Sequence, residues 1–228
     1  LFNVVGGKVN GIQISGLYNQ SLDTVHAIQV AGLFNQTVGR VDGIQVAGIF
    51  NHSCNSAHGL QIAGVYNHTN SNLDFGQLAG VVNFSGGNTK GIQVAGVANI
   101  TSKSIEGVQV SGVFNYAKHL KGVQIGLINY TDSSSGLSIG LINIVPNGYH
   151  KLSVYTSELL QLNAAFKSGT KDFYSILLGG FNPGADKKVA SFGYGLGTEL
   201  SIAKWFSINP ELSAQHLYLG DWNHANIL

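Results

Sequence analysis

Hydrophobic and polar positions alternate along most of the chain with a period of two, which is the pattern of β-strands. The two faces of one typical stretch are Ile44, Val46, Gly48 and Phe50, and Val41, Gly43, Gln45, Ala47, Ile49 and Asn51. Short polar segments rich in turn-forming residues, such as 36–40 and 86–88, separate these stretches. The pattern predicts strands of about eleven residues joined by turns of about five residues.

The alternating stretches repeat one another. A nonapeptide such as GIQVAGIFN or GLQIAGVYN returns along the chain and ends in asparagine. These asparagines are Asn3, Asn19, Asn35, Asn51, Asn67, Asn83, Asn99 and Asn115 at a spacing of sixteen, followed by Asn129 and Asn143 at a spacing of fourteen. A fixed period of this length predicts a repeat architecture before any single residue is considered.

Two all-β architectures fit a sixteen-residue repeat. In a β-solenoid each repeat is one coil, and equivalent residues stack in parallel register. In an up-and-down sheet each repeat is one strand and one turn, and successive strands run in opposite directions. We expect the second, a repeat-built antiparallel sheet or barrel of outer-membrane type. The alternative is a β-solenoid with sixteen-residue coils, followed by a C-terminal antiparallel β segment.

Strand length, aromatic placement and strand number favour the antiparallel arrangement. A strand of about eleven residues is roughly 36 Å long, and a tilt of roughly 40° brings it close to the ~25 Å apolar band of an outer-membrane barrel. An aromatic residue precedes many of the asparagines, so alternating strand directions would place aromatics at both rims. The C-terminal segment has about five expected strands, too few to close a barrel without the repeats.

The chain is expected to have two parts. Residues 1–145 form the β-repeat region, with fourteen-residue repeats at its end. Residues 146–228 follow with longer alternating segments, which we read as antiparallel strands continuous with the repeat sheet.

Composition adds information on surface and partners. Only 10% of the residues are charged, against roughly 25% in an ordinary soluble domain, so an apolar surface is expected. The formal net charge is +1 and no run of Lys and Arg occurs, which argues against nucleic acid as a partner. No run of about 18 apolar residues is present, so a membrane span would have to be β. Membrane lipid, or other outer-membrane or surface proteins, are the expected partners.

The repeats, together with GLINIVPNGYHKLSVYTSELLQLNAAFKSGTKDFYSILLGGFNPG and FGYGLGTELSIAKWFSINPEL, resemble the bacterial outer-membrane surface-repeat proteins of spirochaetes and Bacteroidetes. The resemblance covers nearly the whole chain. It implies a β-rich fold and a location in the bacterial outer membrane or at the cell surface. It carries no catalytic residues over to this sequence.

Two polar series are candidate functional residues. The glutamines would either line a lumen with uncharged groups or form a structural ladder whose amides satisfy one another. The asparagines, Asn19 to Asn143, are expected at strand ends, where asparagine favours turns. Seven of them begin Asn-x-Ser/Thr triplets, which are glycosylation acceptors in a suitable system. The glutamines are Gln13, Gln29, Gln45, Gln61, Gln77, Gln93, Gln109 and Gln124.

Catalytic and metal-binding patterns are weak by comparison. His52, Cys54, His58 and His68 gather in neighbouring turns, but their spacing matches no zinc motif. The carboxylates are scattered, and no nucleophile motif occurs. We therefore expect no enzyme activity, no metal and no cofactor. The expected function is a non-enzymatic outer-membrane or cell-surface component, structural or channel-like. The alternative is a soluble surface-exposed solenoid that acts as a scaffold or adhesin towards proteins or glycans.

Overall fold

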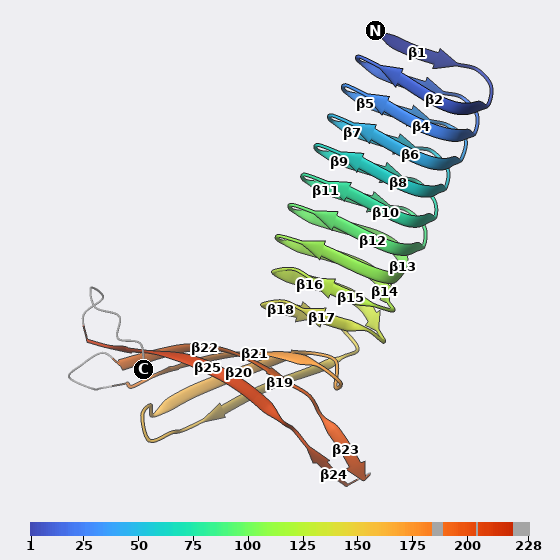
Figure 1. Ribbon diagram of the computed structural model, residues 1–228. Helices are drawn as coiled ribbons and strands as arrows, with labels where there is room; N and C mark the ends of the chain where they lie inside the picture. The colour runs from blue at the N-terminus through green and yellow to red at the C-terminus, as the bar shows by residue number, and fades with distance from the viewer. Residues whose placement is uncertain (184–188, 204, 221–228) are drawn as a thin grey trace. The chain divides into compact units, whose positions relative to one another are not determined.

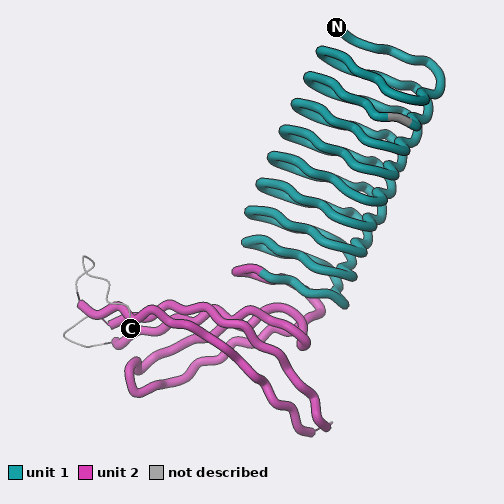
Figure 2. Tube along the Cα trace, viewed as in Figure 1, with its two compact units in different colours: residues 1–139 teal, residues 140–228 magenta. Residues whose placement is uncertain are grey.

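The computed structural model describes residues 1–183, 189–203 and 205–220 (Figure 1). Every regular element within these ranges is a β-strand. The chain divides into two compact units, residues 1–139 and residues 140–228 (Figure 2). This boundary lies close to the one expected after residue 145.

Unit 1 is a β-solenoid in which each sixteen-residue repeat forms one coil, with a longer strand and a shorter strand joined at a corner (Figure 1). The longer strands are β2 (Val9–Ser15), β4 (Val25–Ala31), β6 (Val41–Ala47), β8 (Ala57–Ala63), β10 (Leu73–Ala79) and β12 (Thr89–Ala95). The shorter strands are β1 (Phe2–Val5), β3 (Tyr18–Ser21), β5 (Phe34–Thr37), β7 (Phe50–Ser53), β9 (Tyr66–Thr69) and β11 (Val82–Ser85). The last coils contain β13 (Ala98–Ser111), β14 (Phe114–Leu120), β15 (Val123–Ile125), β16 (Ile128–Ser134) and β17 (Leu137–Ile139).

Strands of successive coils pair in parallel and in register. Gln45 lies beside Gln61 in the pairing of β6 with β8, and Asn51 lies beside Asn67 in the pairing of β7 with β9. The β-solenoid alternative is therefore confirmed, and the expected antiparallel barrel is wrong for the repeats. The eleven-residue stretches are not single strands, because a corner divides each of them into a seven-residue and a four-residue strand.

The core of unit 1 is narrow and mixed in polarity. Alternate residues of each strand point inward, so that one coil places Val41, Gln45 and Ala47 against Asn51 and Ser53, all buried. Equivalent residues stack along the coils, as the cluster of Val41, Ala57 and Leu73 shows. Most of the outward residues are aliphatic or aromatic. This distribution inverts the usual one, with amides inside and many hydrophobic side chains outside.

Unit 2 contains the C-terminal antiparallel strands that the sequence predicts. β19 (Tyr149–Tyr155), β20 (Leu162–Gly169), β21 (Tyr174–Phe181), β22 (Val189–Gly197) and β25 (Glu211–Leu219) form a five-stranded sheet in this order. β23 (Leu200–Ala203) pairs with β24 (Phe206–Ile208), and β18 (Ile142–Ile144) precedes the sheet. The five-stranded sheet is separate from the parallel sheet of the coils, whereas the sequence pattern predicts one continuous sheet.

A polar cluster closes the core of unit 2 around Tyr174. The ring of Tyr174 is fully buried, and its Oη donates to Oε1 of Glu211 at 2.7 Å. Burial, together with this hydrogen bond, raises the pKa of Tyr174 above its usual value. Burial acts to raise the pKa of Glu211, but the hydrogen bonds from Lys167 and Tyr174 outweigh it and hold this pKa below its ordinary value. The cluster therefore keeps a neutral tyrosine beside an ionised carboxylate.

Candidate functional site

The asparagine side chains form a continuous ladder inside the coils. Nδ2 of Asn51 donates to Oδ1 of Asn67, one coil further on, at 2.9 Å. The same Nδ2 donates to the carbonyl of Ile62 in the next coil at 2.7 Å and to the carbonyl of Gln45 in its own coil at 3.3 Å. One buried amide therefore joins two coils and fastens the corner between the two strands of a coil.

The glutamines form a second ladder, with donors that point the opposite way. Nε2 of Gln61 donates to Oε1 of Gln45, in the preceding coil, at 2.8 Å. Hydroxyls of the short strands join in, since Oγ1 of Thr69 donates to Oε1 of Gln61 at 2.9 Å. Buried polar groups need hydrogen-bond partners, and stacking places an identical amide one coil away from each glutamine. The sequence repeat therefore also sets the spacing of these hydrogen bonds.

These positions settle where the two predicted polar series lie. The glutamines from Gln29 to Gln124 are at most 1% exposed. They fill the core rather than line a lumen, so this burial gives no support to a channel through the coils. The sequence places the asparagines at strand ends, but Asn51 and its equivalents from Asn19 to Asn83 are the second residues of four-residue strands and are fully buried. The difference arises because their amides are needed inside, at the corner.

Outside the coils, the longer strands present a broad face that we call the long-strand face. It consists of the outward residues of β2, β4, β6, β8, β10, β12 and the equivalent parts of β13, β15 and β17. Two aliphatic rows run along it, the first including Ile12, Ile28, Ile44, Leu60, Ile92 and Val108, and the second including Ile14, Val30, Val46, Ile62, Leu78 and Val94. Many of these side chains are well exposed, for instance Ile92 at 49%.

A row of ionisable side chains borders these aliphatic rows, and basic and acidic residues alternate in it from coil to coil. Its two histidines carry a charge only when they are protonated. We call it the charged row. In chain order it contains His26, Asp42, His58, Asp74, Lys90, Glu106 and Lys121. Nδ1 of His58 lies 2.7 Å from Oδ2 of Asp74, and Nζ of Lys121 lies 3.1 Å from Oε1 of Glu106.

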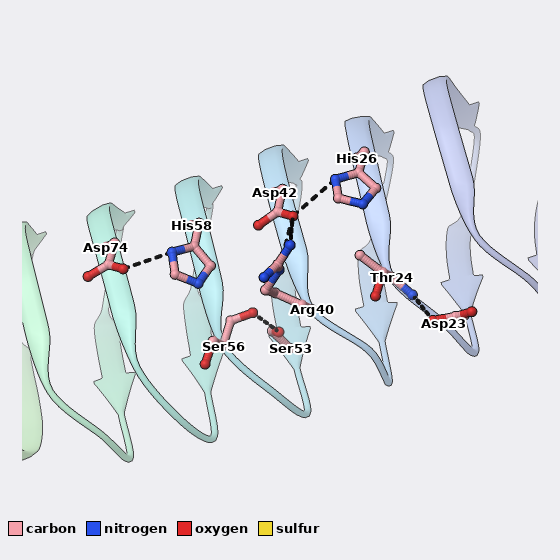
Figure 3. Close-up of polar contacts among 9 residues, drawn as sticks. All are labelled: Asp23, Thr24, His26, Arg40, Asp42, Ser53, Ser56, His58 and Asp74. Atoms are coloured by element: carbon pink, nitrogen blue, oxygen red, sulfur yellow. Dashed lines mark hydrogen bonds and ion pairs between the residues drawn. The ribbon is translucent and has the colours of Figure 1, made fainter.

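Figure 3 shows the start of this charged row, where His26 points toward Asp42 at 3.0 Å and His58 toward Asp74. Arg40 reaches Asp42 from the adjoining turn, with Nη2 2.6 Å from Oδ2. Like charges one coil apart would repel, so alternation is the arrangement that a parallel stack tolerates.

Phe75 interrupts the long-strand face at its centre. It lies beside Gly59 and Gly91 in the neighbouring coils, at a position where the backbone takes positive φ, and its own φ is 104°. Such a conformation costs a bulky residue about 1–3 kcal/mol. The ring is nevertheless 69% exposed. An exposed aromatic in a strained position is a candidate contact residue.

Sequence reasoning missed both the alternating row and Phe75. Aligning the repeats would have revealed the alternation at a spacing of sixteen. It would also have shown that Phe75-Gly76 stands where the neighbouring coils have Gly59-Leu60 and Gly91-Ile92. Neither signal is visible within a single repeat.

The histidine and cysteine residues of the turns lie together only in part. The rings of His52 and His68 are 4.9 Å apart, and Nε2 of His52 lies 3.9 Å from Sγ of Cys54. His58 instead pairs with Asp74. Burial, and then the neighbouring His52, lower the pKa of His68. No three His, Cys, Asp or Glu side chains converge as a metal site within the described residues.

Two further results bear on the site. Within the described ranges, no helix has the length and hydropathy of a membrane span. Family models, curated proteins and solved structures were compared with the chain, and none of them matches it. The long-strand face, with its two aliphatic rows, alternating charges and Phe75, is therefore identified as the candidate functional site on its geometry alone.

Proposed function

We propose that this chain is a non-enzymatic scaffold at the bacterial cell surface, which binds a protein partner through the long-strand face of its solenoid. The observation that carries the proposal is the pair of exposed aliphatic rows bordered by the alternating charges. Nucleic acid is not proposed as a partner, because the formal net charge is only +1 and lysine and arginine form no cluster in the sequence.

The polar core supports a scaffolding role. Two amide ladders with opposite donor directions tie each coil to its neighbours on both sides. Core side chains held in this way have little freedom, so the outward rows keep a fixed spacing of about 4.8 Å per coil. A rigid, regular surface loses little conformational entropy when a partner binds.

The size of the apolar area supports a protein partner. The two aliphatic rows are about 13 Å wide and about 43 Å long over nine coils, or roughly 560 Å². The largest apolar patch of a typical monomer is about 300–600 Å² and is often functional. The charged row along one border matches the common anatomy of protein interfaces, an apolar centre with a polar rim.

The location at the cell surface is proposed from the resemblance of the repeats. Membrane lipid is the competing occupant of the aliphatic rows. It is less well suited to this face, because the charged side chains at its border would have to remain in water or in the headgroup region.

The test labels single cysteines in intact cells that produce the chain, on a Cys54→Ser background. Asn55→Cys reports a turn and Ile44→Cys reports the long-strand face; both native side chains are exposed. With a membrane-impermeant maleimide, we expect the turn cysteine to react readily and the face cysteine to react about tenfold more slowly in cells than in purified, dilute protein.

Each result has a defined meaning. An unreactive turn cysteine in cells would rule out the surface location. Equal reactivity of the face cysteine in cells and in purified protein would rule out a docked partner. Co-flotation of the purified chain with phosphatidylcholine vesicles, lost on mutating Ile44→Glu, would assign the face to lipid instead.

A further inference from the structure

We propose that the partner on the long-strand face is a second copy of this chain, docked antiparallel about a twofold axis that passes between β10 and β12. This inference rests on the proposed function and names its partner. Three features carry it: the alternating charges, the interruption at Phe75 and Gly76, and the size of the face.

A twofold axis that lies along the strand direction has a simple consequence for a solenoid. It reverses the order of the coils but leaves each row at the same position along the strands. Each row therefore faces the same row of the second copy, with the coils in the opposite order. The aliphatic rows then meet aliphatic rows, and the charged row meets the charged row. Two facing sheets pack about 10 Å apart, which leaves room for the side chains of both.

Because its residues alternate, the charged row is complementary to the charged row of a second copy that runs in the opposite coil order. When the axis passes between two neighbouring coils, every basic residue of the row faces an acidic residue of the second copy. With the axis between Asp74 and Lys90, Asp74 faces Lys90 of the second copy and His58 faces Glu106. In the next rung outward, Asp42 faces Lys121. An axis placed on a rung would bring like charges together, so the charges require an axis that passes between two coils.

The same axis gives a place to Phe75. The exposed ring would lie over Gly91 of the second copy, where no side chain competes for space. Ile92, which is 49% exposed, would lie over Gly76 of the second copy. The side chains of Phe75 and Ile92 would thus each lie over a glycine of the second copy, and the twofold axis repeats both contacts. The positive φ of Phe75 is accounted for as the cost of presenting this ring.

The area is sufficient for a stable dimer. The axis lets eight coils overlap. Six of them contribute seven residues of longer strand, as β10 does, and two contribute the three-residue strands β15 and β17. This corresponds to roughly 750 Å² on each copy. Standard stable interfaces bury about 800 Å² per partner.

The experiment is sedimentation velocity of the purified full chain over a range of micromolar concentrations. We expect a reversible dimer.

Asp74→Lys should weaken this dimer about tenfold or more, because the introduced lysine would then face Lys90 of the second copy. Adding Lys90→Asp should restore the dimer, since the two exchanged charges again face each other with opposite sign. Within one chain the double variant places like charges side by side, the new lysine next to His58 and the new aspartate next to Glu106. A purely intramolecular role for the row therefore predicts no restoration.

Phe75→Gly separates association from folding. Glycine accepts the positive φ without strain, so the midpoint of thermal unfolding, measured by circular dichroism on dilute monomer, should rise. Dimerisation should weaken about tenfold. A residue that only stabilises its own coil would change both quantities in the same direction.

Three results would overturn the inference. They are a monomer at every concentration, a Phe75→Gly variant that dimerises as well as the natural chain, and a double charge variant that stays monomeric like Asp74→Lys. If the purified chain is monomeric while the face cysteine is still protected in cells, the proposed function stands and another protein is the partner. If protection is also absent, both fail.

Discussion

Asn67→Asp is expected to lower the free energy of unfolding of the solenoid by about 3–5 kcal/mol, the cost of leaving a buried charge uncompensated. Nδ2 of Asn67 donates to Oδ1 of Asn83 at 2.9 Å, to the carbonyl of Leu78 at 2.7 Å and to the carbonyl of Gln61 at 3.3 Å. A carboxylate has no donor for these three acceptors. The substitution keeps the size of the side chain, so the loss measures the ladder rather than packing.

The measurement is urea unfolding followed by circular dichroism, with Asn55→Asp as the matched control. Asn55 is exposed in a turn and accepts a hydrogen bond from the backbone nitrogen of Ser56 at 2.9 Å, a role that a carboxylate keeps. We expect the control to change stability by less than about 0.5 kcal/mol. Equal losses in both variants would show that asparagine at position 67 has no special role.

The pH dependence of Asn67→Asp gives an independent check. A buried carboxyl surrounded by acceptors has its pKa raised in the folded state, so the folded state binds the proton more tightly than the unfolded state does. Stability of this variant, relative to the natural chain, should therefore fall as the pH rises through the carboxyl pKa and recover on acidification.

Gly64→Ala is expected to destabilise the solenoid by about 1–3 kcal/mol, the usual cost of overpacking. A Cβ added at Gly64 would lie 2.1 Å from the carbonyl oxygen of Gly48, in the corner of the preceding coil. Backbone atoms form this contact, so the coils would have to separate locally. Separation would also stretch the amide ladders beside the corner.

Gly179 in β21 supplies the control for this glycine. A Cβ added there would meet only the carbonyl oxygen of Ser191, at an ordinary contact distance of 3.9 Å. Gly179→Ala should therefore leave the urea midpoint almost unchanged or raise it slightly, because alanine restricts the unfolded chain. If both alanine variants unfold at the same urea concentration, close stacking at the corner is not what limits stability.

The sequence predicts the repeat and its period well, because both follow from identical residues at fixed spacing. It predicts strands, because alternation reports β-structure whichever way the residues face. It does not reveal the corner, since Gly48 and Ile49 continue the alternation in the sequence although both lie exposed in the structure. An aliphatic residue at an exposed corner gives no sign that the strand has ended.

The prediction of antiparallel pairing is wrong for a related physical reason. Strand length and aromatic placement favour a barrel only if the hydrophobic rows face lipid, and those rows do face outward. The core of the coils decides the direction of strand pairing. Gln45 and Asn51 are buried there and hydrogen-bond to identical residues one repeat away. An antiparallel neighbour would not supply them in register. Polar residues at a strict period are thus the stronger indicator of a stacked core.

The candidate site is less predictable than the fold. The exposed aliphatic rows follow from the outward positions of the repeats, once the coil is known. The alternating charges and the φ of Phe75 depend on comparing neighbouring coils, because both are relations between residues sixteen apart. Single-repeat patterns do not contain them.

Parallel stacking of sixteen-residue coils is tested most directly by disulfide formation between equivalent outward residues. On a Cys54→Ser background, Ile44→Cys and Leu60→Cys lie in register on β6 and β8, where adjacent strands are about 4.8 Å apart, within disulfide range. Under mild oxidation we expect this pair to cross-link within each chain nearly completely. The pair Ile28→Cys and Leu60→Cys, two coils apart at about 9.6 Å, should not. Failure of the first pair to cross-link, or equal cross-linking of both, would contradict the stacked solenoid.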